Sequence, residues 1–247
     1  MNTVKDKKIW VIGASAGIGE ALTRRLDEHG AMLAISARSE EALYNLGKSL
    51  TKKPLIYPLD VTNEANFNRS FKALIAAWGE IDSIVYLPAM YNPMKLERLD
   101  LQSVRSELDA NLMAVFNAIS VVIPVLKKQK HGQFLICSSI AGFVGLPKSQ
   151  PYSCTKTAVT NLTETLKCEY PYLDIKVIHP GFVKTRLTDK NNFKMPMIIT
   201  PEKAASYIYS GMLTSKFEIA FPGRFVFLVK LLRFLPYWLY FKIIKLN

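Results

Sequence analysis

Short apolar runs and helix-like stretches alternate along nearly the whole chain of 247 residues, and this alternation most constrains its fold. The apolar runs have the length and composition of buried strands, and they occupy residues 8–12, 32–36, 55–60, 81–87, 133–137, 174–179 and 217–221. Because stretches of helical period lie between these runs, the chain predicts crossover units and a mostly parallel sheet with helices on both faces.

The helical stretches occupy residues 20–28, 42–50, 64–78, 101–125, 152–170 and 200–212. Ser39 and Thr200 are placed to cap two of these helices, and Pro201 fits a first helical position. No linker rich in proline or glycine divides the chain. We therefore expect residues 1–223 to form one α/β domain, a doubly wound, three-layer sandwich of the Rossmann type with about seven strands.

The composition favours a globular protein with a basic surface. Hydrophobic residues make up 49% of the chain, and the formal net charge is +12. The basic residues are scattered and form no nucleic-acid-binding module, so nucleic acid is not expected as a partner. The three cysteines and three histidines lack metal-ligand spacing, so no metal site is expected.

Cysteine usage and the N-terminus both favour a cytoplasmic location. Cys137, Cys154 and Cys168 fit small, buried or partly buried residues in a reducing compartment. The residues before the first apolar run are too few and too polar for a signal peptide.

A glycine-rich turn joins the first apolar run to the first helix. Gly13, Gly17 and Gly19 allow a tight turn and let the backbone approach a pyrophosphate closely. The following helix adds unpaired N–H groups and the positive end of its dipole. We expect this turn to bind a dinucleotide, the alternative being a glycine-rich turn without a ligand. Its other expected contacts are Ser15, Ala16 and Ile18.

The end of the second apolar run predicts which dinucleotide is bound. Many NAD-specific sites place an acidic residue there to hold the ribose hydroxyls, whereas this chain has Arg38 and Ser39. A 2′-phosphate can pair with the Arg38 guanidinium and the Ser39 hydroxyl. We therefore expect NADP(H) to be favoured over NAD(H). The alternative is that Arg38 is a solvated loop residue and Ser39 only a helix cap.

Tyr152 and Lys156 are four residues apart and lie on one face of a helix that begins here. A phenol loses its proton near pH ~10, and an ammonium one turn away lowers that pKa. The pair would then exchange a proton nearer neutrality. Ser139, after the run 133–137, is placed to hydrogen-bond a substrate oxygen. The alternative is a surface pair that happens to have this spacing.

Taken together, these pieces resemble the short-chain dehydrogenase/reductase family over roughly residues 8–190. The glycine turn matches the family's TGxxxGIG segment, and Ser139, Tyr152 and Lys156 match its catalytic trio. The further matches are an adenine-contacting pair, a helix asparagine that supports the proton relay, and a segment that holds the nicotinamide carboxamide. These correspond to Asp60 and Val61, to Asn111, and to 180–185, in which Pro180, Gly181, Val183 and Thr185 are expected to touch the cofactor.

The resemblance implies hydride transfer between C4 of a nicotinamide and a carbonyl or secondary alcohol. Ser139 would hydrogen-bond the carbonyl oxygen and Tyr152 would act as general acid or base. Lys156 would lower the Tyr152 pKa and bind the nicotinamide ribose. Asn111 would position a water that links Lys156 to solvent, or would satisfy a backbone group at a helix bend. A homodimer or homotetramer is also expected.

Two places depart from the family pattern. Ile12 replaces the threonine before the first glycine. The Asn-Asn-Ala-Gly segment after the fourth run is Leu87-Pro88-Ala89-Met90 here, so only Ala89 remains to flank the cofactor ribose. These changes put local geometry and cofactor affinity in question. The alternatives to an NADP(H)-linked reductase are therefore an NAD-linked alcohol dehydrogenase and a catalytically weak nucleotide-binding scaffold.

The residues after Ser139 and after Thr185 bear on the substrate, and the C-terminal tail bears on what the protein contacts. The resemblance implies a lid over the substrate in the stretch that follows Thr185. Seven apolar residues in this stretch and after Ser139 suggest a pocket for a lipophilic substrate: Ala141, Phe143, Val144, Leu146, Phe193, Met195 and Met197. Residues 224–247 form an apolar, basic tail that Pro236 should divide into two helices. The tail suits a membrane interface, or it packs on a partner subunit or over the pocket mouth.

Overall fold

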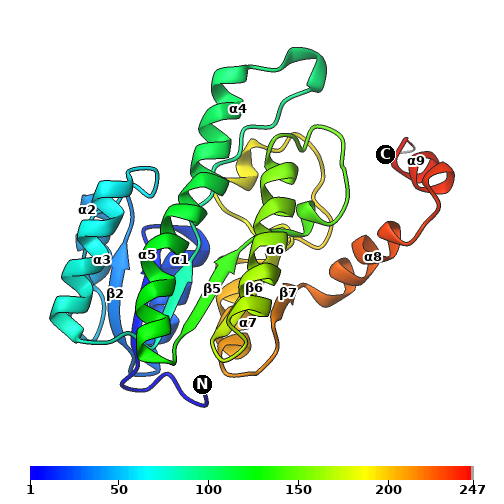
Figure 1. The fold of residues 1–247 in the computed structure, drawn as a ribbon. Helices are drawn as coiled ribbons and strands as arrows, with labels where there is room; N and C mark the ends of the chain where they lie inside the picture. The colour runs from blue at the N-terminus through cyan, green and yellow to red at the C-terminus, as the bar shows by residue number, and fades with distance from the viewer. Residues whose placement is uncertain (246–247) are drawn as a thin grey trace.

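The computed structural model describes residues 1–245, and they form a sheet with helices on both faces (Figure 1). Seven strands make one parallel sheet in the order β3-β2-β1-β4-β5-β6-β7. The strands are β1 Lys8–Ile12, β2 Met32–Ser36, β3 Leu55–Ile56, β4 Ser83–Tyr86, β5 Gln133–Cys137, β6 Asp174–Pro180 and β7 Glu218–Phe221. The predicted Rossmann-type architecture is confirmed, and the sheet is parallel throughout.

Helices connect successive strands and then form the tail. They are α1 Gly17–Glu28, α2 Glu40–Lys48, α3 Glu64–Trp78, α4 Leu101–Leu108, α5 Ala114–Gln129, α6 Tyr152–Glu169, α7 Pro201–Met212, α8 Gly223–Arg233 and α9 Tyr237–Lys245. The predicted caps are present: the Ser39 and Thr200 hydroxyls accept from the N–H groups of Ala42 and Lys203, both at 3.3 Å. Pro236 lies between α8 and α9, as expected.

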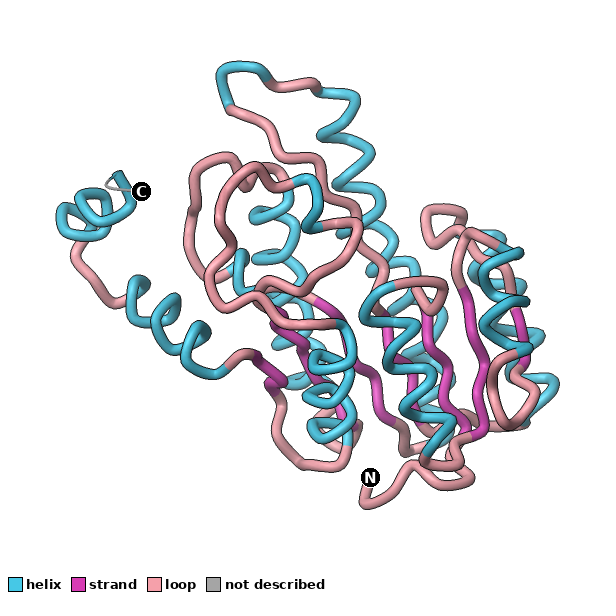
Figure 2. Tube along the Cα trace, turned by 180° about the vertical axis from the view of Figure 1, so that it is seen from behind, coloured by secondary structure: helices cyan, strands magenta, loops and turns pink. Residues whose placement is uncertain are grey.

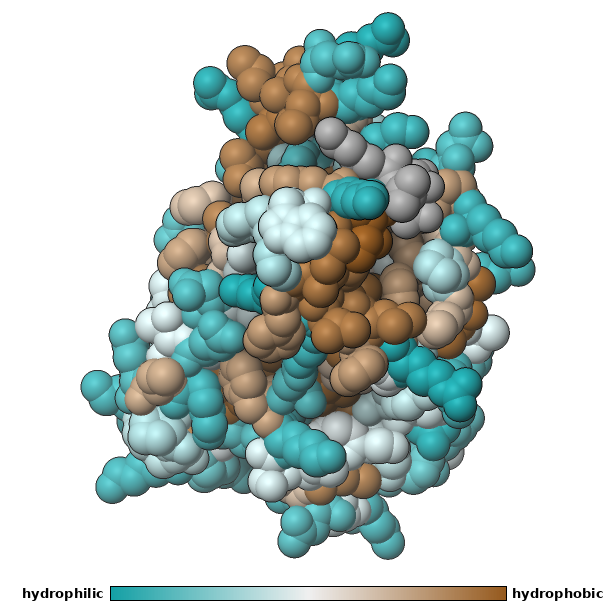
Figure 3. Space-filling model, turned by 90° about the vertical axis from the view of Figure 1, so that its right-hand side faces the viewer, coloured by the Kyte–Doolittle hydropathy of each residue, from teal (hydrophilic) through white to brown (hydrophobic). Residues whose placement is uncertain are grey.

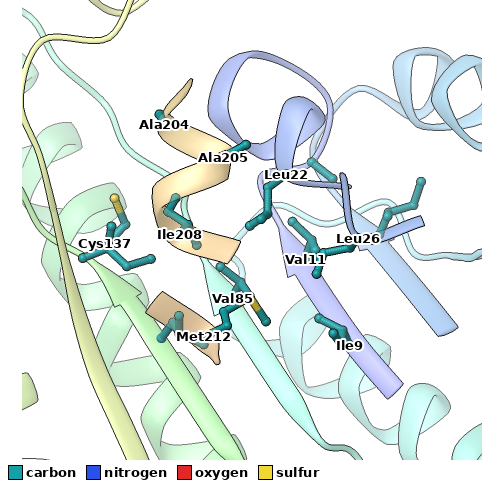
Figure 4. Packing of buried hydrophobic residues seen from close by; sticks show 14 of the residues in the cluster. Ile9, Val11, Leu22, Leu26, Val85, Cys137, Ala204, Ala205, Ile208 and Met212 are labelled. Carbon is teal, nitrogen blue, oxygen red and sulfur yellow. The ribbon is translucent and has the colours of Figure 1, made fainter. Parts of the chain in front are cut away.

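Strand residues alternate between the two faces of the sheet and so build two cores. On the face covered by α1 and α7, Val11 and Val85 meet Leu22 and Ile208 (Figure 4). On the other face Trp10 packs between two residues of α3, with ring centroids 5.4 Å from Phe67 and 5.6 Å from Phe71. Both faces are therefore sealed, as an all-parallel sheet requires.

Several expected boundaries were wrong. The third strand ends at Ile56 instead of residue 60, and Pro58 follows it at the outer edge of the sheet. Backbone bonds from Tyr57 to Ile35 and from Leu59 to Ala37 still hold this stretch along β2. The fourth strand is shorter than 81–87, and α1 begins at Gly17, three residues earlier than expected.

The cysteines also differ from expectation. Cys137 is buried at the end of β5, but Cys154 and Cys168 are exposed on α6. Their spacing places both sulfurs away from the apolar stripe of α6 that carries Val159 and Leu166.

The helical stretch from Leu101 to Gln129 is longer than expected and is interrupted by a π-helical turn, Asp109–Met113. Among the described residues it is the one helix long and apolar enough, by length and composition alone, to cross a membrane. Val115, Ala118 and Val122 on it are buried in the core, so the helix is explained as a layer of the domain.

Because the strands are parallel, their carboxyl ends share one edge of the sheet, where the long loops gather (Figure 2). The strand order reverses between β1 and β4, and a crevice for a ligand is expected at such a switch point. The loops after Ile12, Ser36, Tyr86, Cys137 and Pro180 all meet at this edge.

Candidate active site

The glycine turn after β1 brings three stretches of backbone into close approach. The N–H groups of Gly13 and Ala14 donate to the Ser36 carbonyl oxygen at 2.7 and 3.0 Å, which ties the turn to β2. A Cβ on Gly19 would lie 2.0 Å from the Gly13 carbonyl oxygen. Gly17 has a φ of +57°, and a Cβ there would lie 2.9 Å from Cγ2 of Thr185. The turn therefore requires glycine at positions 17 and 19, because a side chain there would clash with neighbouring atoms.

Helix α1 starts on this turn with free backbone donors. Its N-cap residue is Ala16, and no side chain caps the helix. The N–H groups of the first turn and the positive end of the helix dipole are therefore available to an anion. The half-buried Ser15 and the exposed Ala16 lie beside this opening. The residues present fit the pyrophosphate of a dinucleotide.

The second-strand end carries the residues expected to distinguish NADP(H) from NAD(H). Arg38 and Ser39 are both exposed beyond β2, and Ser39 caps α2. Asp60 lies nearby: burial raises its pKa, but hydrogen bonds from Thr62 and the charge of Arg38 outweigh that effect and hold the pKa below its ordinary value. Asp60 is thus ionised beside Arg38, and the adjacent Val61 is buried.

The segment after β6 faces the glycine turn. Pro180 ends the strand, and the Gly181 N–H donates to the Phe221 carbonyl oxygen at 2.7 Å. Val183 is buried and pairs with Ile199. Thr185, in contact range of the Gly17 position, closes this side of the crevice. The predicted phosphate and carboxamide segments are therefore neighbours.

The loop after β5 is fastened to the start of α6. The Ser138 hydroxyl donates to the Lys156 carbonyl oxygen at 2.7 Å, and the Ser153 hydroxyl donates to the Ala141 carbonyl oxygen at 2.7 Å. A Cβ on Gly142 would lie 2.9 Å from the Lys156 carbonyl carbon, so only glycine permits this approach. These contacts fix the position of the loop that carries Ser139.

The structure brings the three predicted catalytic residues together. The Ser139 hydroxyl lies close enough to the Tyr152 phenol to lower the Tyr152 pKa. Lys156 is buried, and its Nζ lies 5.5 Å from the centroid of the Tyr152 ring. That Nζ donates to the Cys137 carbonyl oxygen at 2.9 Å. A hydroxyl, a phenol and an ammonium therefore share one small volume at the carboxyl end of β5.

The expected effect of Lys156 on the Tyr152 pKa is not what this geometry produces. Burial is the largest cause and raises the Tyr152 pKa, and the nearby Ser139 hydroxyl lowers it only in part. Lys156 is bonded to Cys137 instead of the phenol, and burial lowers its own pKa. The Tyr152 phenol is therefore protonated and can act as a donor in this arrangement. Its pKa would be lower only if the Lys156 ammonium turned toward it.

Asn111 lies in the π-helical turn and holds the loop after β4. Its Oδ1 accepts from the Met90 N–H and its Nδ2 donates to the Met90 carbonyl oxygen, both at 2.7 Å. The same Nδ2 lies 3.3 Å from the Thr155 hydroxyl. Of the two roles considered for Asn111, these contacts match the backbone-satisfying one. They also keep the altered segment, with the half-buried Ala89, in place.

Four residues near Tyr152 were not assigned a role from the sequence: Tyr91, Glu107, Lys190 and Asn191. The Tyr91 ring meets the Tyr152 ring edge-on, with centroids 5.1 Å apart, and its hydroxyl donates to Asn191 Oδ1 at 2.8 Å. Lys190 Nζ donates to the Tyr91 carbonyl oxygen at 2.8 Å. The lid is therefore joined to the loop after β4, directly beside the candidate proton donor.

Glu107 supports this arrangement from one helical turn before Asn111. Its Oε1 accepts from the Asn92 N–H at 2.8 Å, while its buried Oε2 has no hydrogen-bond partner within residues 1–245. Burial raises the Glu107 pKa, and the charge of Glu107 contributes to raising the Tyr152 pKa. The available sequence signal was a carboxylate four residues before Asn111, on the same helix face.

The residues expected to line an apolar pocket divide into two groups. Phe193 and Met197 lie on the lid and are largely exposed. Phe143 and Val144 instead pack against Val226 and Val229 of α8, because the tail folds back on the loop after Ser139. Phe143 and Val144, which were expected to line the pocket, are therefore covered by the C-terminal tail.

Comparison with known proteins identifies the family of this chain. The family model described as short chain dehydrogenase matches residues 7–195. An uncharacterized oxidoreductase from Staphylococcus epidermidis is 30% identical over 195 residues, which cover 78% of this chain and 85% of that protein. One from Myxococcus xanthus is 29% identical over 233 residues, covering 92% and 91%.

Solved structures show the same fold at lower identity. A short-chain dehydrogenase/reductase from Burkholderia phymatum in complex with NAD has a TM-score of 0.84 at 19% identity over 94% of each chain. An alcohol dehydrogenase from Thermococcus sibiricus complexed with 5-hydroxy-NADP has a TM-score of 0.78 at 24% identity, over 87% of this chain and 95% of that one. With the family match, this chain belongs to the short-chain dehydrogenase/reductase family and is one of its oxidoreductases.

Proposed function

We propose that the protein is an NADP(H)-dependent carbonyl reductase or alcohol dehydrogenase in which Tyr152 is the general acid or base. The observation that carries the proposal is the closeness of the Ser139 hydroxyl to the Tyr152 phenol, beside the buried Lys156, whose Nζ lies 5.5 Å from the centroid of the Tyr152 ring. A substrate oxygen that reaches both hydroxyls would accept two hydrogen bonds, which polarise its carbonyl.

In this proposal, residues of the chain bind the cofactor and the substrate and supply the proton for the carbonyl oxygen. Bound NADPH would supply a hydride, and the same nucleotide in oxidised form would take one up. The α1 N-terminus would hold the pyrophosphate, and Val183 and Thr185 lie where the nicotinamide end would be expected. Ser139 would orient the substrate carbonyl. Tyr152 would give its phenolic proton to the carbonyl oxygen, and Lys156 would stabilise the phenolate that remains. The products are an alcohol and the oxidised cofactor.

The preference for NADP(H) follows from the exposed second-strand end. Arg38 offers a planar guanidinium to a phosphate, and Ser39 offers a hydroxyl next to it. The Asp60 carboxylate lies near Arg38 and accepts two hydrogen bonds from Thr62. A 2′-phosphate would pair with the Arg38 guanidinium and the Ser39 hydroxyl.

The proposed substrate is lipophilic, and the proposed assembly is a homodimer or homotetramer. The lid carries the exposed Phe193 and Met197, which suit an apolar substrate. The α4–α5 face exposes Leu108, Met113 and Phe116, which suit contact with a second copy. Sedimentation velocity on the wild type and a Phe116→Gln variant would measure that contact.

A panel of aliphatic, aromatic and acyl-chain carbonyl compounds, assayed with NADPH at the nicotinamide absorbance, tests the proposal. Turnover should rise with apolar chain length and should exceed turnover with NADH. A protein that binds NADPH but turns over no member of the panel in either direction would be the nucleotide-binding scaffold instead.

A further inference from the structure

The two tail helices present different faces to the protein and to the outside. On the inner face Val226 and Val229 are buried against Ile140. The Tyr240 hydroxyl donates to the Gly145 carbonyl oxygen and fastens α9 to the same loop. The inner face of the two tail helices is therefore packed against the rest of the domain.

The outer face has no partner within the described residues, although it is the more apolar of the two. Phe227, Leu231 and Phe234 form a stripe at i, i+4 and i+7 of α8, and Phe234 is 82% exposed. The exposed apolar or aromatic residues on this face are Phe227, Leu228, Leu231, Phe234, Tyr237, Trp238 and Phe241. Figure 3 shows the apolar surface on this side of the molecule. Burying such side chains is strongly favourable.

The lid extends this surface toward the active site. The rings of Phe193 and Phe182 lie 5.8 Å apart, and Phe182 stacks on Phe225 of α8 at 5.6 Å. Met197 and Ile198 on the lid are also exposed. We name the outer face of α8–α9 together with lid residues 193–198 the docking face.

The charged residues within the segments of the docking face are all basic. Neither residues 190–200 nor residues 224–245 contain an aspartate or glutamate. Five basic side chains are exposed in these two ranges: Lys190, Lys194, Arg224, Arg233 and Lys242. Basic residues beside an apolar face are attracted to anionic lipid headgroups, and Trp238 and Tyr237 are residue types enriched at membrane interfaces.

We propose that the docking face binds in the plane of an anionic lipid membrane. Helices α8 and α9 have 11 and 9 residues, about half of the ~20 that a spanning helix needs, so they lie along the surface. A second copy of the chain is a poorer occupant, because two uniformly basic faces would repel each other. Membrane contact through the lid also places the active-site mouth at the bilayer.

Vesicle co-sedimentation of the full chain tests the proposal. Vesicles of phosphatidylcholine alone are compared with vesicles in which about a third of the lipid is phosphatidylglycerol. The wild type should bind the anionic vesicles, and added salt should weaken the binding. The triple variant Phe234→Gln/Trp238→Gln/Phe241→Gln should partition at least ~10-fold less. The control Tyr44→Gln removes an exposed aromatic side chain from α2 and should bind like the wild type.

A second pair of variants separates charge from apolar contact. Arg233→Gln with Lys242→Gln should weaken binding to anionic vesicles and leave any binding to neutral vesicles unchanged. Circular dichroism and thermal unfolding establish that each variant is folded. Equal partition of wild type and triple variant overturns the proposal. So does a wild type that stays in the supernatant while the triple variant changes its mass in sedimentation velocity, because a second copy then occupies the face.

Discussion

At the scale of single residues, the position of the Tyr152 phenol decides the proposed chemistry. Tyr152→Phe removes the hydroxyl that lies beside Ser139 and leaves the ring contact with Tyr91 in place. Carbonyl reduction should fall roughly 10²- to 10⁴-fold, while NADPH affinity, measured by fluorescence titration, should change little. Tyr172→Phe, at an exposed position, is the control. Near-normal turnover by Tyr152→Phe would reject the proton-donor role.

Arg38 decides the proposed cofactor preference. Arg38→Asp replaces the guanidinium by a carboxylate that would repel a 2′-phosphate. The ratio of kcat/KM with NADPH to that with NADH should fall by at least ~10-fold, because hydrogen bonds to charged groups contribute about 1.5–3 kcal/mol. Lys128→Asp makes the same charge change at an exposed site at the end of α5. An unchanged ratio in Arg38→Asp would remove the NADP(H) assignment.

Glu107 offers a test of the environment around the phenol. Its charge contributes to the raised Tyr152 pKa, so Glu107→Gln should lower that pKa while still accepting the hydrogen bond from Asn92. Reduction needs the protonated phenol, so its rate should begin to fall at a lower pH than in the wild type. The pH profile of kcat/KM measures this. Superimposable profiles for the two proteins would show that Glu107 only holds the loop.

At the scale of elements, the turn between β1 and α1 has no room for side chains. Gly19→Ala would place a Cβ 2.0 Å from the Gly13 carbonyl oxygen, and such overpacking costs about 1–3 kcal/mol. NADPH binding should weaken and the thermal midpoint should fall. Gly223→Ala is the matched control, since a Cβ there meets no atom within 4 Å. Equal cofactor affinity in both variants would contradict the close-approach argument.

Helix α8 is anchored to the sheet through a carboxylate. The Glu218 pKa is about 2 instead of 4.5, chiefly because of its hydrogen bond with His179 and also because of Lys230 on α8. A lowered folded-state pKa adds stability above the unfolded-state value, and that stability is lost as pH falls from about 4.5 toward 2. The stability difference between wild type and Glu218→Gln should shrink across that window in urea unfolding. Glu28→Gln on α1 should show no such trend.

At the scale of the whole molecule, sequence patterns predicted the features that depend only on residues close together in the chain. β2 and α3 have the expected bounds because apolar runs, caps and helical period all lie within the segments themselves. The glycine turn and the Ser139, Tyr152 and Lys156 group were found because their spacing is fixed along the chain. The shortened third strand shows the limit, because the strand-like run 55–60 pairs with β2 as a regular ladder only at Leu55 and Ile56.

Such patterns could not predict contacts between segments that are far apart in the sequence. Tyr91 and Asn191 are 100 residues apart in sequence, and nothing in either segment indicates that the other will be its neighbour. The same holds for Phe143, whose place beneath α8 depends on where the tail folds. The bond from Lys156 to Cys137 likewise depends on three-dimensional placement, and it changed the expected pKa relation.

The seat of α8 on the loop after Ser139 has a practical consequence for shortened versions of this protein. A stop codon after residue 222 would strip the cover from Ile140, Phe143 and Val144, directly beside Ser139. A protease cut in the short turn between α8 and α9 would release the Tyr240 anchor from Gly145. Removing the C-terminus is therefore expected to damage turnover as well as surface attachment, so the two losses must be separated by point substitutions on the outer face.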